Sequence, residues 1–71
     1  MARAPQVGDH YSDPQSPGRI VRIVEKDATG FTVETVRAAN DAVSHRAVGR
    51  VTHVGIRTMS KFHYEPNPVL D

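Results

Sequence analysis

Hydrophobic residues are concentrated in three segments of the chain, residues 19–26, 31–37 and 47–57. Valine, isoleucine and threonine are frequent in these segments, and such β-branched residues are typical of strands. No long stretch repeats its hydrophobic residues at the 3.6-residue spacing of an amphipathic helix. We therefore expect three main strands, with two shorter strands at residues 7–11 and 63–65.

The sequence Asp27-Ala28-Thr29-Gly30 is expected to turn the chain between the first two of these segments. Aspartate suits the start of a type I turn, and glycine accepts the positive φ of the bulge that follows it. Such a turn would pair Asp27 with Phe31 and Ile23 with Thr35. The core face would carry Val21, Ile23, Phe31 and Val33. The outward face would carry Arg22, Lys26, Thr32 and Glu34. A two-residue turn would shift the register by one residue and exchange the two faces.

The last strand segment and the residues after it are expected to complete the core. Thr52, Val54 and Ile56 alternate with other residues there, so their side chains should share the inward face. A single turn at residues 58–62 should follow, and its Met59 and Phe62 should cap the core.

Two stretches read as loops. Pro17-Gly18 suits the central positions of a type II turn, because proline presets φ and glycine accepts a positive φ. Residues 37–46 are polar and rich in alanine. A single helical turn there would be marginal in water, so we expect a mobile loop.

These elements together predict an all-β fold. Five short strands with one long loop near the front and tight turns later are similar to a small five-stranded Src-homology-3-like barrel, with a long loop before the fourth strand. Closing a barrel removes the sheet edges that a small β protein must otherwise protect. The barrel would span residues 7–65, between a flexible arm at residues 1–6 and a proline-containing tail at residues 66–71.

A pattern of mostly structural residues extends over positions 7–64. Its first part is Val7-Gly8, Tyr11, Asp13-Pro14, Gly18-Arg19, Val21 and Ile23. Its second part is Gly49-Arg50, Thr52, Val54, Ile56, Lys61-Phe62 and Tyr64. In this pattern the chain resembles short actinobacterial and actinobacteriophage proteins of uncharacterised function. It departs from them in residues 37–46 and in the lysine at position 61, where arginine is expected. The resemblance implies a small barrel of phage or actinobacterial origin and supplies no catalytic residue.

Composition narrows the class of protein further. With 71 residues, the chain has room for one domain with a small core. The absence of cysteine excludes disulfides, thiolate catalysis and iron–sulfur clusters, and it fits a reducing cytoplasm. No apolar run is long enough to span a membrane, and the first six residues lack the features of a signal peptide. We therefore expect a cytoplasmic protein, in the host cytoplasm if a phage encodes it.

Candidate catalytic and metal-binding groups are weak. The four histidines lack the local spacing of zinc ligands; they are His10, His45, His53 and His63. Ser44 beside His45 does not form a nucleophile–base pair, because neighbouring side chains on an extended chain point apart. The five glycines are dispersed and form no phosphate-binding loop. We therefore expect no enzyme activity, no cofactor and no metal.

Basic residues provide one functional hypothesis. The net charge is only +1, yet residues 46–63 contain no acidic residue. If the second and fourth strands lie side by side, their outward cations would form a positive strip for phosphate groups. Tyr11 and Tyr64 could then stack on exposed bases. The strip would consist of Arg22, Lys26, Arg50, His53, Arg57 and Lys61.

Protein–protein interaction is the leading hypothesis. The loop at residues 9–18 should lie near the tail, and its aromatic and acidic residues could form a groove for an extended peptide. The groove would consist of Tyr11, Asp13 and Tyr64. Outward apolar residues could add a contact surface for a host protein or for a second copy in a homodimer, unless they belong to the core. They are Ile20, Val24, Val36 and Val51.

Overall fold

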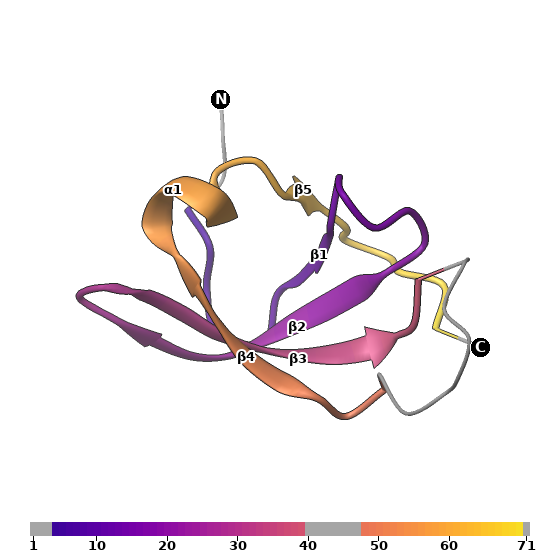
Figure 1. The fold of residues 1–71 in the computed structure, drawn as a ribbon, viewed down its shortest axis with the longest axis horizontal. Helices are drawn as coiled ribbons and strands as arrows, with labels where there is room; N and C mark the ends of the chain where they lie inside the picture. The colour runs from indigo at the N-terminus through magenta and orange to yellow at the C-terminus, as the bar shows by residue number, and fades with distance from the viewer. Residues whose placement is uncertain (1–3, 40–47, 71) are drawn as a thin grey trace.

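A computed structural model of the protein describes residues 4–39 and 48–70. Within these ranges, the chain forms five strands and one short helix (Figure 1). The hydrophobic pattern therefore predicted the mostly-β class and the five strands correctly. The elements in chain order are β1 (His10–Ser12), β2 (Ile20–Asp27), β3 (Gly30–Arg37), β4 (Val51–Gly55), α1 (Ile56–Met59) and β5 (His63–Tyr64).

The five strands form one antiparallel sheet in the order β4-β3-β2-β1-β5. The two edge strands, β4 and β5, are not paired with each other, so the sheet is open and the predicted closed barrel is not confirmed. Helix α1 takes up residues that were expected to end the fourth strand, and β5 has only two residues with which to pair. In Figure 1 the chain leaves β4 through α1 and returns above the curved sheet to β5.

The tip of the β2–β3 hairpin is a two-residue turn, and the predicted three-residue loop is wrong. Asp27 pairs with Gly30, not with Phe31. The Asp27 carboxylate accepts hydrogen bonds from the Thr29 hydroxyl (2.7 Å), the Thr29 N–H (2.8 Å) and the Gly30 N–H (2.9 Å). These bonds close the turn, and the one from the Thr29 hydroxyl is the main reason that the pKa of Asp27 is lowered.

A β-bulge in β2 compensates for the shorter turn. The register shifts between Ile23 and Glu25, so that Ile23 pairs with Val33 and Val21 pairs with Thr35. A two-residue turn alone would exchange the two faces of the hairpin, but the extra residue in β2 restores them. The predicted core face is therefore confirmed, because its four residues are all buried: Val21, Ile23, Phe31 and Val33.

The core continues from the sheet into α1. Val54 and Met59 are buried as predicted, and Phe62 is partly buried against the same cluster. The prediction for Ile56 is wrong, because 57% of this residue is exposed. The alternation of β4 ends where α1 begins, and the helical turn directs Met59 inward in place of Ile56. Among the described residues, the other buried side chains that were not assigned to the core are those of Tyr11, Ile20 and Thr35.

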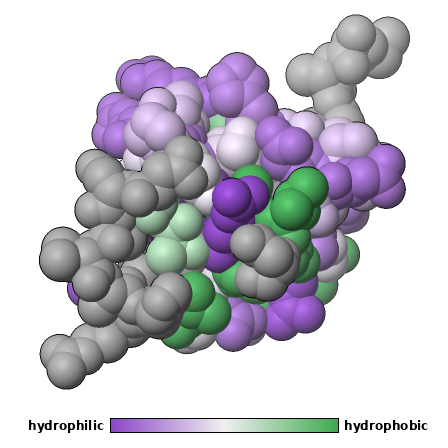
Figure 2. Space-filling model, turned by 90° about the vertical axis from the view of Figure 1, so that its right-hand side faces the viewer, coloured by the Kyte–Doolittle hydropathy of each residue, from purple (hydrophilic) through white to green (hydrophobic). Residues whose placement is uncertain are grey.

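Several expectations concern parts of the chain outside or next to the described ranges. Residues 40–46 of the expected mobile loop lie outside the described residues, as do residues 1–3 of the expected arm. Residues 66–70 contain no helix or strand, and Arg37 Nη1 donates a hydrogen bond to the carbonyl oxygen of Val69 (3.1 Å). Figure 2 shows this end of the molecule, where a few hydrophobic side chains lie among hydrophilic ones. None of the helices in the described ranges has the length and hydrophobicity needed to cross a membrane.

Candidate functional site

A pocket of about 170 Å³ lies between three segments that are distant in the sequence. The first is the front loop, defined here as residues 13–19, which joins β1 to β2. The second is the end of β4, and the third is α1 with the turn that follows it. The residues that line the pocket are Asp13, Pro14, Gln15, Arg19, Val54, Thr58, Lys61 and Phe62.

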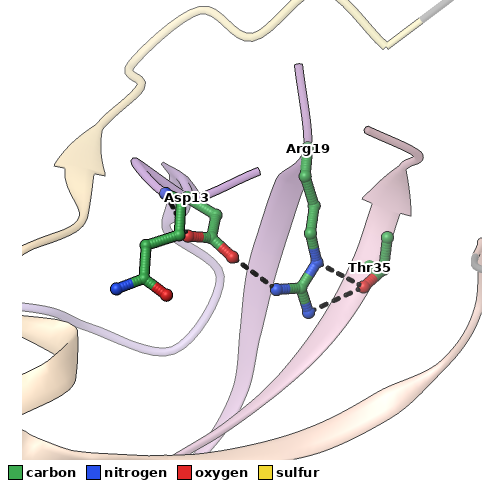
Figure 3. A network of polar contacts seen from close by, with 4 residues as sticks. Asp13, Arg19 and Thr35 are labelled. Atoms are coloured by element: carbon green, nitrogen blue, oxygen red, sulfur yellow. Dashed lines mark hydrogen bonds and ion pairs between the residues drawn. The ribbon is translucent and has the colours of Figure 1, made fainter. Parts of the chain in front are cut away.

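The front loop is fixed to the sheet by the side chain of Arg19 (Figure 3). The Arg19 guanidinium donates two hydrogen bonds to the Thr35 hydroxyl on β3, one from Nε (3.2 Å) and one from Nη2 (3.1 Å). Its Nη1 donates to Asp13 Oδ2 at 2.7 Å and forms an ion pair with it. Arg19 thus joins a buried hydroxyl of the core to an acidic residue at the start of the loop.

Backbone hydrogen bonds close the same loop from within. The Ser16 N–H donates to the Asp13 carbonyl oxygen (3.2 Å), and the Arg19 N–H donates to the Ser16 carbonyl oxygen (2.9 Å). Gly18 is the third residue of the turn at residues 16–19. Its φ of +90° agrees with the predicted type II turn. The Gln15 N–H donates to Asp13 Oδ1 (2.9 Å). One wall of the pocket is therefore a well-connected loop.

We expect Arg19→Met to lower the free energy of unfolding by about 2 kcal/mol, because it removes charge-assisted hydrogen bonds from a partly buried acid and a buried hydroxyl. The matched control is Arg22→Met. Arg22 pairs with Glu34 at a similar distance (2.9 Å), but these side chains are 46% and 30% exposed, against 22% and 11% for Arg19 and Asp13. Exposed pairs contribute little, so the control should lose less than about 1 kcal/mol. Urea denaturation measures both, and equal losses would contradict the anchoring role of Arg19.

The pocket combines an apolar floor with an excess of positive charge. Val54 and Phe62 belong to the edge of the core, and Pro14 adds apolar surface from the front loop. The charge of Asp13 is balanced by Arg19 at 2.7 Å. Lys61 forms no ion pair with any residue of the described ranges. The pocket can therefore hold a small apolar group beside a cation.

The predicted basic residues are not gathered into one strip. Strand β3 lies between β2 and β4, so the cations of these two strands are not neighbours. Arg22 pairs with Glu34, and His53 Nε2 lies 3.7 Å from Asp27 Oδ2 and 3.2 Å from the Thr29 hydroxyl.

The other members of the basic set are separated as well. The two-residue turn places Lys26 opposite Phe31, and the Lys26 Nζ lies 3.4 Å from the Pro5 carbonyl oxygen. Arg50 and Arg57 are exposed, before β4 and on α1 respectively. Of the six predicted residues, Lys61 alone lines the pocket.

The three residues predicted to form an aromatic groove do not line one common pocket. Tyr11 is 4% exposed and belongs to the core, and its ring centroid lies 5.6 Å from that of Tyr64, which is partly exposed. Neither tyrosine lines the pocket, whereas Asp13 does. Sequence reasoning missed Arg19 and Thr58 as site residues. The opposite charges of Asp13 and Arg19 on either side of a proline–glycine turn are the signal that could have indicated the anchored loop.

The expected outward apolar surface is also reduced. Ile20 is buried, and Val24 and Val36 are half-buried, so Val51 alone of these four residues is largely exposed. This result agrees with the alternative that such residues extend the core.

No group of three or more His, Cys, Asp or Glu side chains in residues 4–39 and 48–70 is arranged to hold a metal ion. Ser44 and His45 lie outside the described residues. Comparisons of the chain with protein-family models, with curated proteins and with solved structures give no match.

Proposed function

We propose that the protein is a non-enzymatic protein-interaction module whose pocket holds one side chain of a partner protein. The observation that carries this proposal is the pocket, with its anchored front-loop wall and its apolar floor. Its volume of about 170 Å³ is below the ~300–1,000 Å³ of small-molecule sites, so the pocket suits a single side chain. Interfaces commonly depend on one such anchor in a desolvated pocket.

We further propose that the fold is a variant of the Src-homology-3-like small barrel. Four consecutive antiparallel strands, a single helical turn and a short last strand that pairs with the first support this assignment. The phage or actinobacterial origin, and a host protein as partner, rest on the resemblance of the sequence pattern. A second copy of the chain is the other partner that fits an interaction module.

Nucleic-acid binding has less support. The cations of β2 and β4 are separated by β3, and both Arg22 and His53 lie beside acidic residues. A single-stranded DNA oligonucleotide tests this alternative in a fluorescence anisotropy titration. Binding that weakens with salt, and that falls in the double variant Arg57→Ala plus Lys61→Ala, would favour nucleic acid over protein.

A pocket-filling substitution tests the proposed function. Peptides that bind the wild-type protein are first selected from a displayed library of random linear sequences. We expect Thr58→Trp to weaken their binding by about tenfold or more, because the indole occupies the space of the anchor side chain. Isothermal titration calorimetry measures the affinity.

The matched control for this test is Ile56→Trp, which adds the same side chain to an exposed position of α1 outside the pocket lining. Its affinity should stay within about twofold of wild type. Equal affinities of the two variants, or a library that contains no binder, would contradict the proposed function.

A further inference from the structure

The charged side chains that line the pocket carry a net positive charge. Asp13, Arg19 and Lys61 are its ionisable lining residues, and the Asp13 carboxylate is engaged by Arg19 at 2.7 Å and by the Gln15 N–H at 2.9 Å. One cation is thus balanced within the protein, and Lys61 supplies the excess. A partner group that enters the pocket meets a net positive charge.

Arg19 also retains hydrogen-bonding capacity. A guanidinium has five N–H donors, and three interactions with Thr35 and Asp13 engage Nε, Nη1 and Nη2 once each. One N–H on each of the two terminal nitrogens makes no hydrogen bond to another residue of the described ranges. Because the guanidinium is already held in place, it would lose little side-chain entropy when it donates to a ligand.

The floor of the pocket requires an apolar group next to that charge. Val54 and Phe62 present core-edge surface, and Pro14 faces the same space from the front loop. Covering this surface with a partner's aliphatic or aromatic side chain removes apolar area from water and is favourable. A purely polar ligand would leave it exposed.

We propose that the pocket recognises an acidic–apolar motif, a linear segment of a partner protein with a large apolar side chain beside an aspartate or glutamate. The apolar side chain packs on Val54, Phe62 and Pro14, and the carboxylate binds Lys61 and the remaining donors of Arg19. A basic side chain at the same place is repelled by Lys61, because Asp13 is already neutralised. This inference rests on the proposed function and specifies the chemistry of the partner.

Parallel selections from the random peptide library test this motif. The library is applied to the wild type, to Lys61→Glu and to Lys26→Glu, the last being a matched charge reversal at an exposed lysine outside the pocket lining. We expect wild type and Lys26→Glu to enrich an acidic residue beside a large apolar one. Lys61→Glu should lose the acidic residue and enrich lysine or arginine in its place.

The affinities of one selected peptide for the wild type and for Lys61→Glu test the motif quantitatively. Changing its glutamate to glutamine should weaken binding to wild type by about fivefold or more, since a charge-assisted hydrogen bond becomes a neutral one. The same change should have little effect on binding to Lys61→Glu. Peptides with no acidic preference, or with a basic one on wild type, would overturn the inference.

Different results would contradict the acidic–apolar motif and the proposed function. If selected peptides lack the acidic residue but still lose affinity with Thr58→Trp, the acidic–apolar motif is wrong and the proposed function stands. If no peptide depends on Thr58, the proposed function is wrong, and the motif is overturned with it.

Discussion

Replacing Gly30 with valine is expected to lower the free energy of unfolding by about 3 kcal/mol or more, the sum of overpacking and positive-φ costs. A Cβ atom at this position would overlap the Val54 carbonyl oxygen and lie 2.9 Å from the Gly55 Cα, both backbone atoms of β4. The φ of Gly30 is +151°, which a β-branched residue resists. A domain of this size has about 4–11 kcal/mol of total stability, so this variant should be largely unfolded on warming.

Gly8→Val is the matched control for this experiment. Gly8 has a φ of +95°, yet no atom lies within 4 Å of the position its Cβ would occupy. This variant should lose only the backbone cost, about 1–2 kcal/mol. Circular dichroism with urea measures both free energies. Equal losses in the two variants would mean that β4 does not approach the β2–β3 turn as closely as described.

Met59→Ala is expected to lower the free energy of unfolding by about 3 kcal/mol, the usual cost of truncating a large buried side chain. Met59 is 1% exposed and belongs to the cluster that holds α1 against the sheet. The loss should also weaken peptide binding, because α1 carries Thr58 and forms one wall of the pocket.

The substitution Ile56→Ala distinguishes the exposed Ile56 of the structure from the buried Ile56 that alternation alone predicts. The alternating pattern predicts Ile56 in the core, whereas the structure leaves 57% of it exposed. Its truncation should therefore cost less than about 0.5 kcal/mol. If Ile56→Ala proves as destabilising as Met59→Ala, the chain continues as a strand past Gly55 and α1 is placed wrongly.

Features of the fold that depend on residues close together in the sequence could be predicted, whereas features that depend on distant residues could not. Residues 20–24 have two possible apolar faces, and the choice of the face with Val21 depended on an expected turn that the structure does not contain. The strands of the hairpin, in contrast, depend on local preferences and could be predicted. The bulge between Ile23 and Glu25 could not, because the run of β-branched residues contains no glycine or other local signal for an extra residue. The two-residue turn and the bulge together left the core face unchanged, but Lys26, which was expected on the outward face, lies opposite Phe31.

The end of β4 shows where a local pattern fails. Nothing in the alternation of residues 52–56 indicates that the strand stops at Gly55, and the helical turn that follows changes the inward residue from Ile56 to Met59. Tyr11 was expected to be available for stacking but is buried, because β1 lies between β2 and β5 within the sheet. Whether such a side chain is buried depends on the order of the strands in the sheet, which local sequence patterns do not indicate.

The candidate site depends on the same long-range information. Asp13 and Lys61 were predicted as interaction residues, but the reason for each was different from the role that the structure supports. Asp13 is part of the anchor with Arg19 and Thr35, and Lys61 is the unbalanced cation of a pocket built from three distant segments. The structure does not support the basic strip, because Glu34 lies next to Arg22 and Asp27 lies next to His53.

A nitrogen-15 chemical-shift map of the protein, titrated with a peptide selected on wild type, tests most directly whether the pocket is the interaction site. The largest amide shift changes should fall on Asp13, Gln15, Thr58 and Phe62, which line it. Largest changes on the opposite side of the sheet, at Thr32, Glu34 and Val51, with the pocket amides unmoved, would contradict the proposal.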